Sequence, residues 1–218
     1  MKKILLVVLA AMLLCATGAF ADTYQLNCTT TSTCSATSWG TISVTQDGSI
    51  ANRVDVSVVL NNAFFVDTGG HYTFTFNLNG TPTTVALDGT YSQNNFSYLG
   101  AGSYSQSGFG TFGFAFNCNA PGGSATDGCG PGASNTTTGP LTFYVEGAGF
   151  TPSNFIANSD GVFFSADLYY QTAAGGFVTG PIGSMGGTPS VPEPTSMALL
   201  GTGMVGLAGA IRRKLGKK

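Results

Sequence analysis

The chain has 218 residues and carries little charge, with eight Lys and Arg, ten Asp and Glu, and a formal net charge of −2. The basic residues lie almost entirely at the two ends. Residues 22–190 hold only Arg53 against eight aspartates and Glu146. Because contacts to phosphates need Lys and Arg, this composition excludes nucleic acid as a partner. Abundant Gly, Ser, Thr and Asn with scattered aromatics is typical of secreted β-proteins.

The N-terminus, residues 1–21, has the three parts of a secretory signal peptide. Lys2 and Lys3 precede an apolar core at residues 4–14, and residues 19–21 read Ala-Phe-Ala, which matches an A-x-A cleavage site. We therefore expect export by the Sec translocon and cleavage by signal peptidase. The mature chain should begin at Asp22.

Apolar residues in the segment 22–174 alternate with polar ones at the period of two that half-buried strands have. The clearest run, residues 53–60, places three valines and Leu60 on one face. Further strands are expected at residues 41–46, 72–78, 112–116, 141–145 and 162–170, and weaker ones at 83–87 and 96–99. Asn-Gly and Asp-Gly turns separate them, and no stretch has the period of an amphipathic helix. The pattern predicts an all-β ectodomain, an antiparallel β-sandwich of jelly-roll-like type.

Four cysteines remain once Cys15 leaves with the signal peptide. An even number in an oxidising compartment predicts two disulfides. Three pairings are possible, and proximity in the chain favours Cys28 with Cys34 and Cys118 with Cys129. A zinc site is the alternative, but it lacks a Cys-x-x-Cys spacing. We expect no metal site and no cofactor.

Two Gly-rich segments interrupt the strands. Residues 120–140 are rich in Gly, Ser, Thr and Pro, which predicts a long exposed loop. Residues 175–190 have few apolar anchors, so we expect a flexible linker between the sandwich and the C-terminal segment.

Catalytic chemistry finds little support. His71 is the only histidine, and nothing in the sequence pairs it with a particular serine. The spacing of the carboxylates does not single out the facing pair that a glycosidase needs. Four aspartates precede glycine and are interpreted first as turn residues, with Ca²⁺ binding as the alternative: Asp47, Asp88, Asp127 and Asp160. We expect no enzyme activity and no catalytic residues, a secreted hydrolase being the least favoured alternative.

Sugar binding is a better candidate. Carbohydrate modules built on β-sandwiches use exposed aromatic rings for stacking and Asn, Asp and Gln for hydrogen bonds. The candidate stacking rings are the only tryptophan and three tyrosines from a polar, Gly-rich stretch: Trp39, Tyr91, Tyr98 and Tyr104. The alternatives are a core ring for Trp39 and ordinary strand surface for the tyrosines. Tyr169 and Tyr170 place adjacent rings on opposite strand faces.

The last 28 residues have three parts. Val191, Pro192, Glu193 and Pro194 form a rigid turn. Residues 195–211 contain no charge and would make a helix of about 25 Å, within the range of a membrane span. The basic tail, residues 212–218, begins with Arg212, Arg213 and Lys214. By the positive-inside rule it stays in the cytoplasm. We expect one transmembrane helix in the inner membrane.

This tail resembles the PEP-CTERM sorting signal of Gram-negative bacteria, with the motif, the hydrophobic helix and the basic cluster in the same order. The resemblance implies processing near the Pro-Glu-Pro motif by exosortase, a membrane-embedded cysteine transpeptidase, and a link to exopolysaccharide and biofilm. A plain anchor that is never processed is the alternative. We therefore expect an exported protein, transiently anchored and then placed at the cell surface or in the extracellular matrix. Its expected role is structural or adhesive, with a carbohydrate-binding module as the alternative.

Overall fold

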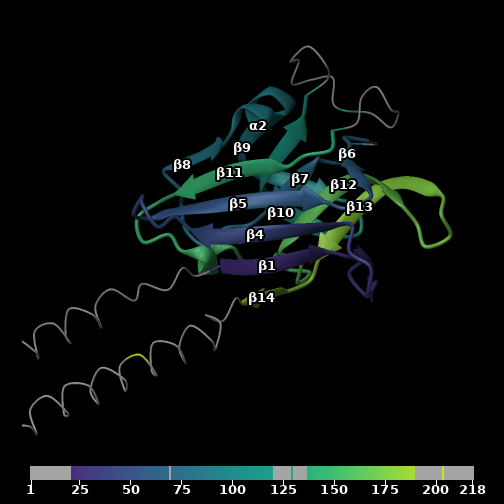
Figure 1. The fold of residues 1–218 in the computed structure, drawn as a ribbon, viewed down its shortest axis with the longest axis horizontal. Helices are drawn as coiled ribbons and strands as arrows, with labels where there is room; N and C mark the ends of the chain where they lie inside the picture. The colour runs from purple at the N-terminus through teal and green to yellow at the C-terminus, as the bar shows by residue number, and fades with distance from the viewer. Residues whose placement is uncertain (1–20, 69, 120–128, 130–136, 190–202, 204–218) are drawn as a thin grey trace, which may run out of the picture. The chain divides into compact units, whose positions relative to one another are not determined.

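Two antiparallel sheets lie against each other across a hydrophobic core in the computed structural model (Figure 1). The structure describes residues 21–68, 70–119, 129, 137–189 and 203. Residues 21–189 form a unit of their own, and both sheets belong to it. Most of the predicted signal peptide and the predicted sorting segment lie outside the described residues.

The first sheet has six strands. In spatial order they are β14 (Gly187–Pro189), β1 (Ala21–Leu26), β4 (Gly40–Gln46), β5 (Arg53–Leu60), β11 (Leu141–Glu146) and β8 (Thr84–Leu87). All neighbours pair antiparallel. Chain order and spatial order differ, since the last strand of the described domain lies beside the first, with Pro189 opposite Asp22.

The second sheet has eight strands. Its main path is β3 (Thr33–Cys34), β2 (Cys28–Thr30), β13 (Phe177–Ser184), β12 (Phe164–Gln171), β7 (Phe74–Phe76), β10 (Gly110–Cys118) and β9 (Phe96–Gln106). The eighth strand, β6 (Ala63–Phe65), pairs with the far end of β12. Two short helical segments, α2 (Thr90–Asn95) and η1 (Pro152–Asn154), connect strands.

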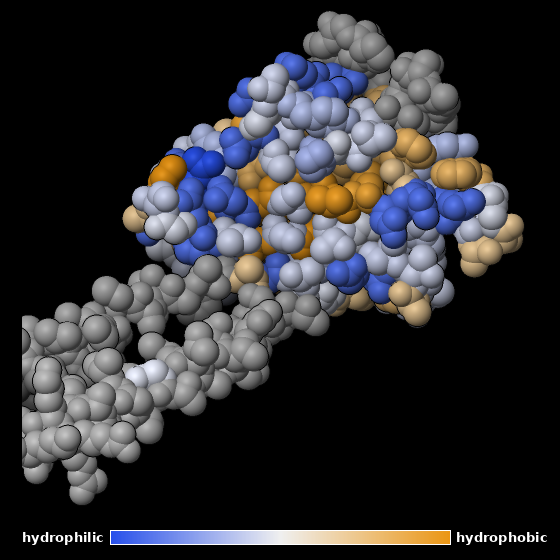
Figure 2. All heavy atoms as spheres, viewed as in Figure 1, coloured by the Kyte–Doolittle hydropathy of each residue, from blue (hydrophilic) through white to orange (hydrophobic). Residues whose placement is uncertain are grey.

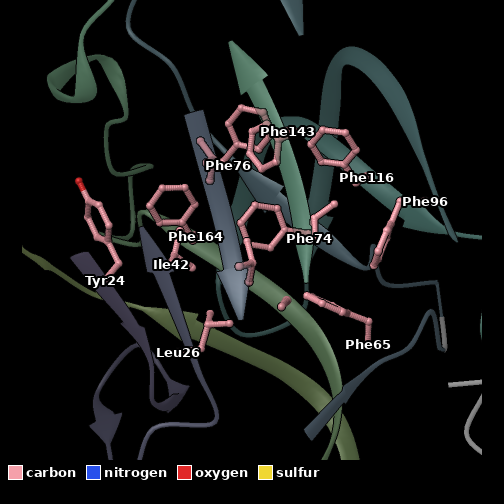
Figure 3. Packing of buried hydrophobic residues seen from close by; sticks show 14 of the residues in the cluster. Tyr24, Leu26, Ile42, Phe65, Phe74, Phe76, Phe96, Phe116, Phe143 and Phe164 are labelled. Atoms are coloured by element: carbon pink, nitrogen blue, oxygen red, sulfur yellow. The ribbon is translucent and has the colours of Figure 1, made fainter. Parts of the chain in front are cut away.

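Phenylalanine rings from both sheets fill the core (Figure 3). Phe76 on β7 packs across the interface on Phe143 of β11 at a centroid distance of 5.2 Å, and Phe116 of β10 lies 4.7 Å from the same ring. Val54, Val56 and Val58 of β5 are buried, as the alternation predicts. The all-β antiparallel sandwich is therefore confirmed.

The expected linker at residues 175–190 is wrong as far as residue 189. Residues 177–184 form β13, which pairs along its whole length with β12, and β14 pairs with β1. Composition is misleading at this strand because one of its two glycines, Gly183, serves close packing. A Cβ at Gly183 would lie 2.4 Å from a ring carbon of Phe109, and Ile182 is fully buried. The folded domain extends to Pro189.

Both disulfides join the cysteines that are close in the chain. Cys28–Cys34 links β2 to β3, and Cys118–Cys129 links the end of β10 to the one described residue of the segment 120–136. Cys118 and Cys129 are fully buried. The remainder of the predicted exposed loop through residue 136 lies outside the described residues.

The helix expected at residues 195–211 also lies outside them, apart from Gly203. In the part of the chain that is described, no helix has the length and apolar character needed to cross a membrane.

Candidate functional site

Trp39 is a core residue and does not present a stacking face. It is 7% exposed, its ring packs on Tyr170 at 4.7 Å, and its indole N–H donates to the carbonyl oxygen of Gln171 at 2.8 Å. The partner is 132 residues away in the chain, so the polar neighbours of Trp39 in the sequence give no hint of it. The interpretation of Trp39 as a sugar-stacking ring is therefore wrong.

Two of the three candidate tyrosines lie on β9, and their side chains make contacts within the domain. The Tyr104 hydroxyl donates to the carbonyl oxygens of Leu99 and Gly100, at 3.0 and 3.1 Å. The ring of Tyr98 packs on Phe116 at 5.3 Å, and burial raises the pKa of its hydroxyl to about 12. Tyr91, on α2, is 40% exposed.

An unexpected group of rings lies on the outer face of the eight-stranded sheet. Phe64 of β6, Tyr169 of β12 and Phe177 of β13 form this group, which we call the aromatic platform. Their centroids are 4.9 Å apart for Tyr169 and Phe177, 6.2 Å for Phe64 and Tyr169, and 6.4 Å for Phe64 and Phe177. Phe177 is 42% exposed, and the other two are half-buried. The planes of neighbouring rings are tilted by 30 to 43° to each other.

Strand alternation explains why these rings face outward. Phe65 and Tyr170 belong to the buried core, and successive residues of a strand point to opposite faces. Phe64 and Tyr169, which are opposite each other in the register, must therefore point away from the core. The adjacent aromatic pairs Phe64-Phe65 and Tyr169-Tyr170 could have indicated one outward ring on each strand. The sequence does not show that the two pairs lie on neighbouring strands.

A pocket of about 140 Å³ opens beside the platform at the end of β12. We call it the Trp39 pocket because that residue contributes to its wall. Nine residues line it, all uncharged: Ser35, Thr37, Ser38, Trp39, Asn61, Asn62, Gln171, Thr172 and Ala173. Seven of these nine residues carry an amide or a hydroxyl group, which suits hydrogen bonding to a polar, uncharged ligand.

The opposite sheet offers a different surface. Figure 2 shows the face of the six-stranded sheet, where hydrophobic residues gather along its middle strands between hydrophilic ones. Val59 is 55% exposed there. Tyr144 lies under the guanidinium of Arg53, whose carbon is 3.8 Å from the ring centroid. This face has no exposed group of aromatic rings among the described residues.

Among the described residues, Asp167 is the carboxyl whose pKa is most strongly perturbed. It lies on β12 opposite the place where β6 ends and β7 begins, and residues 66–68 and 70–73 lie between these two strands as a loop. The backbone N–H and the hydroxyl of Thr68 both donate to Oδ2 of Asp167 at 2.7 Å, and Oδ1 has no partner among the described residues. Burial raises its pKa to about 6; Thr68 and His71 act in the opposite direction, and Asp67 adds to the rise.

This acidic group is built to hold the loop. Asp167 is fully buried, so a substrate cannot reach its carboxyl, and Thr68 occupies one oxygen. Its backbone also holds both loop ends, since it accepts from Val66 N at 3.0 Å and donates to Thr73 O at 3.1 Å. Within the described residues no three His, Cys, Asp or Glu side chains are grouped so as to hold a metal ion.

Comparison with known proteins bears on the tail. The PEP-CTERM protein-sorting motif matches residues 190–214, a range that contains the predicted motif, the apolar run and the first basic residues. The resemblance of the tail to this signal is confirmed. The chain is thus an exported protein that exosortase recognises and processes at the cell envelope. No curated protein and no solved structure matches it.

Proposed function

We propose that this exported domain is a non-enzymatic, adhesive component of the cell surface or extracellular matrix of a Gram-negative bacterium, and that it binds extracellular polysaccharide. It reaches the envelope through the inner membrane by the Sec translocon, loses its signal peptide to signal peptidase, and is then processed by exosortase. The observation that carries the adhesive role is the aromatic platform of Phe64, Tyr169 and Phe177.

The platform supports adhesion because exposed rings are costly unless something covers them. Aromatic side chains bury large apolar areas, and contiguous exposed apolar patches mark interaction sites. Phe177 is 42% exposed and lies against two further rings of the same face. The apolar C–H faces of pyranose rings can pack on such a surface, while the sugar hydroxyls stay at the rim.

The arrangement of ionisable groups favours a binding role over a catalytic one. The most perturbed carboxyl, Asp167, is buried beneath a loop and bonded to Thr68. The backbone N–H of His71 donates to the carbonyl of that same Thr68 at 3.0 Å, which places the histidine in the loop too. A general base needs hydrogen-bond reach to a substrate proton, and the fully buried Asp167 has none.

Affinity electrophoresis tests the proposal. The exported, processed protein is run in native gels with and without soluble polysaccharide, including the exopolysaccharide of the producing cell. We expect retardation in polysaccharide gels that is lost in Phe177→Ala and kept in Tyr91→Ala. Tyr91 is the matched control because it is exposed to 40% and lies outside the platform. Equal mobility of the wild-type protein in all gels would refute polysaccharide adhesion.

A further inference from the structure

The aromatic platform and the Trp39 pocket are adjacent along the strands. Gln171 lines the pocket, and in the β12–β13 register it lies directly opposite Phe177. Asn62, on the other wall, comes two residues before Phe64, and its carbonyl oxygen accepts from the backbone N–H of Gln171 at 3.2 Å. Residues of the platform and of the pocket are therefore neighbours on β6, β12 and β13.

The pocket presents hydrogen-bonding groups that are not committed elsewhere. The side-chain amides of Asn61 and Asn62 are exposed and make no hydrogen bond to any described residue. Asn62 has a positive φ of 50°, a conformation that Asn adopts more readily than most residues. Gln171 donates from Nε2 to the Gly175 carbonyl at 3.2 Å, which leaves its Oε1 available as an acceptor.

The charge distribution selects against acidic ligands. The pocket lining is uncharged, and Arg53, the only Lys or Arg among the described residues, lies on β5 in the other sheet. Its guanidinium is already within 4 Å of three carboxylates, at 2.8 Å from Asp55, 3.5 Å from Asp47 and 3.8 Å from Asp88. A polyanion would find no cation to pair with on this part of the chain and would meet a net negative domain.

We infer that the platform and the pocket together form one binding site for a neutral polysaccharide. Sugar rings lie against Phe64, Tyr169 and Phe177, and the adjoining residue of the glycan places its hydroxyls on the amides of Asn61, Asn62 and Gln171. The apolar surface supplies affinity and the amides fix orientation, the division of roles common in ligand sites. This inference rests on the proposed adhesive function and names its ligand class and its second subsite.

The test compares two substitutions of the same kind. Asn62→Gly removes the amide from the pocket and keeps the backbone conformation, because glycine accepts a positive φ. Asn52→Gly is the matched control: Asn52 also has a positive φ, of 63°, but its side-chain oxygen accepts from Gly149 N at 3.0 Å, beside the six-stranded sheet. Both variants, Phe177→Ala and the wild type are purified as the exported, processed protein.

Binding is measured by isothermal titration against neutral glycans (β-glucan, galactomannan, arabinoxylan) and acidic ones (alginate, polygalacturonate). We expect binding to at least one neutral glycan, weakened about tenfold in Asn62→Gly and in Phe177→Ala, a loss typical of a central contact, and unchanged in Asn52→Gly. Melting temperatures check that the variants are folded.

Each other outcome refutes a defined part of the proposal. Neutral-glycan binding that survives both site variants places the sugar elsewhere and refutes this site, while polysaccharide adhesion stands. Equal binding of acidic glycans refutes the charge argument. If no glycan binds and the wild type instead self-associates, with Phe177→Ala monomeric, the platform is a protein interface, and the adhesive proposal fails as well.

Discussion

The buried carboxyl of Asp167 should make the stability of this domain depend on pH in an unusual direction. Asp167 joins β12 to the loop 66–73 through Thr68, and its Oδ1 has no partner among the described residues. Its charged neighbours are Asp67, which raises its pKa, and His71, which lowers it. Burial dominates, so the protonated form is favoured in the folded state.

The magnitude follows from the two pKa values. The pKa rises from an ordinary 3.8 to about 6 in the folded domain, a difference of about two units that corresponds to about 3 kcal/mol. Because the folded state binds the proton more tightly, the free energy of unfolding is highest below the unfolded pKa. It should fall as the pH rises from about 4 to about 6 and then level off.

Asp167→Asn tests this account because asparagine mimics the protonated carboxyl. Its side-chain oxygen can still accept from Thr68 at every pH. We expect the variant to match the wild type near pH 4 and to be more stable by up to about 3 kcal/mol near pH 7.

The assay is urea unfolding with disulfides intact, followed by the fluorescence of Trp39, which is buried and will report exposure of the core. Asp160→Asn is the control, since Asp160 is an exposed turn residue. A constant difference between Asp167→Asn and wild type from pH 4 to pH 7 would refute the reasoning, because a carboxyl that titrates must change that difference.

Two further predictions concern packing and processing. Gly183→Ala should lower the free energy of unfolding by about 1–3 kcal/mol, since its methyl would collide with the Phe109 ring; thermal denaturation measures it, and an equal cost in a Phe109→Ala background would contradict the proposed clash. Glu193→Ala should abolish exosortase processing, which mass spectrometry of the exported protein detects as retention of the tail on a chain that begins at Asp22. Glu146→Ala should be processed normally, and normal processing of Glu193→Ala would show that this carboxylate is not recognised.

The alternation of apolar and polar residues was sufficient to predict the strands that have one buried and one exposed face. In β5 the inward positions of the first half are all valine, so period two is visible without knowledge of the partner strand. The same reasoning fails for β13 and β14, because these strands are stabilised by contacts with other segments of the chain. Gly183 is matched to Phe109, and β14 pairs with β1 from the start of the domain. Residues 177–181 of β13 are exposed or half-buried, so no alternation of buried and exposed residues marks this part of the strand.

The aromatic platform was harder to predict because its three residues come from three different strands. The polar neighbours of Trp39 in the sequence suggested an exposed ring. In the structure the ring packs on β12 and the indole N–H donates to a carbonyl oxygen of the same strand. Phe64, Tyr169 and Phe177 give no signal one at a time. They become a surface because β12 pairs with β6 on one side and with β13 on the other. The sequence predicts that such a surface would use aromatic residues. The order of the strands in the sheet decides which aromatic residues lie next to one another.

Because the fold extends to Pro189, the end of the folded domain lies directly before the sorting motif. β13 carries Phe177 and leads within a few residues to β14, which holds the edge of the six-stranded sheet through its pairing with β1. The sorting-motif match begins at residue 190, directly after that pairing ends. Cleavage at the Pro-Glu-Pro motif therefore leaves every described strand in place. A cut only a few residues earlier would remove the strand that pairs with residues 22–24 and open the edge of β1. The position of the motif thus allows exosortase to remove the tail while the aromatic platform and the Trp39 pocket stay intact.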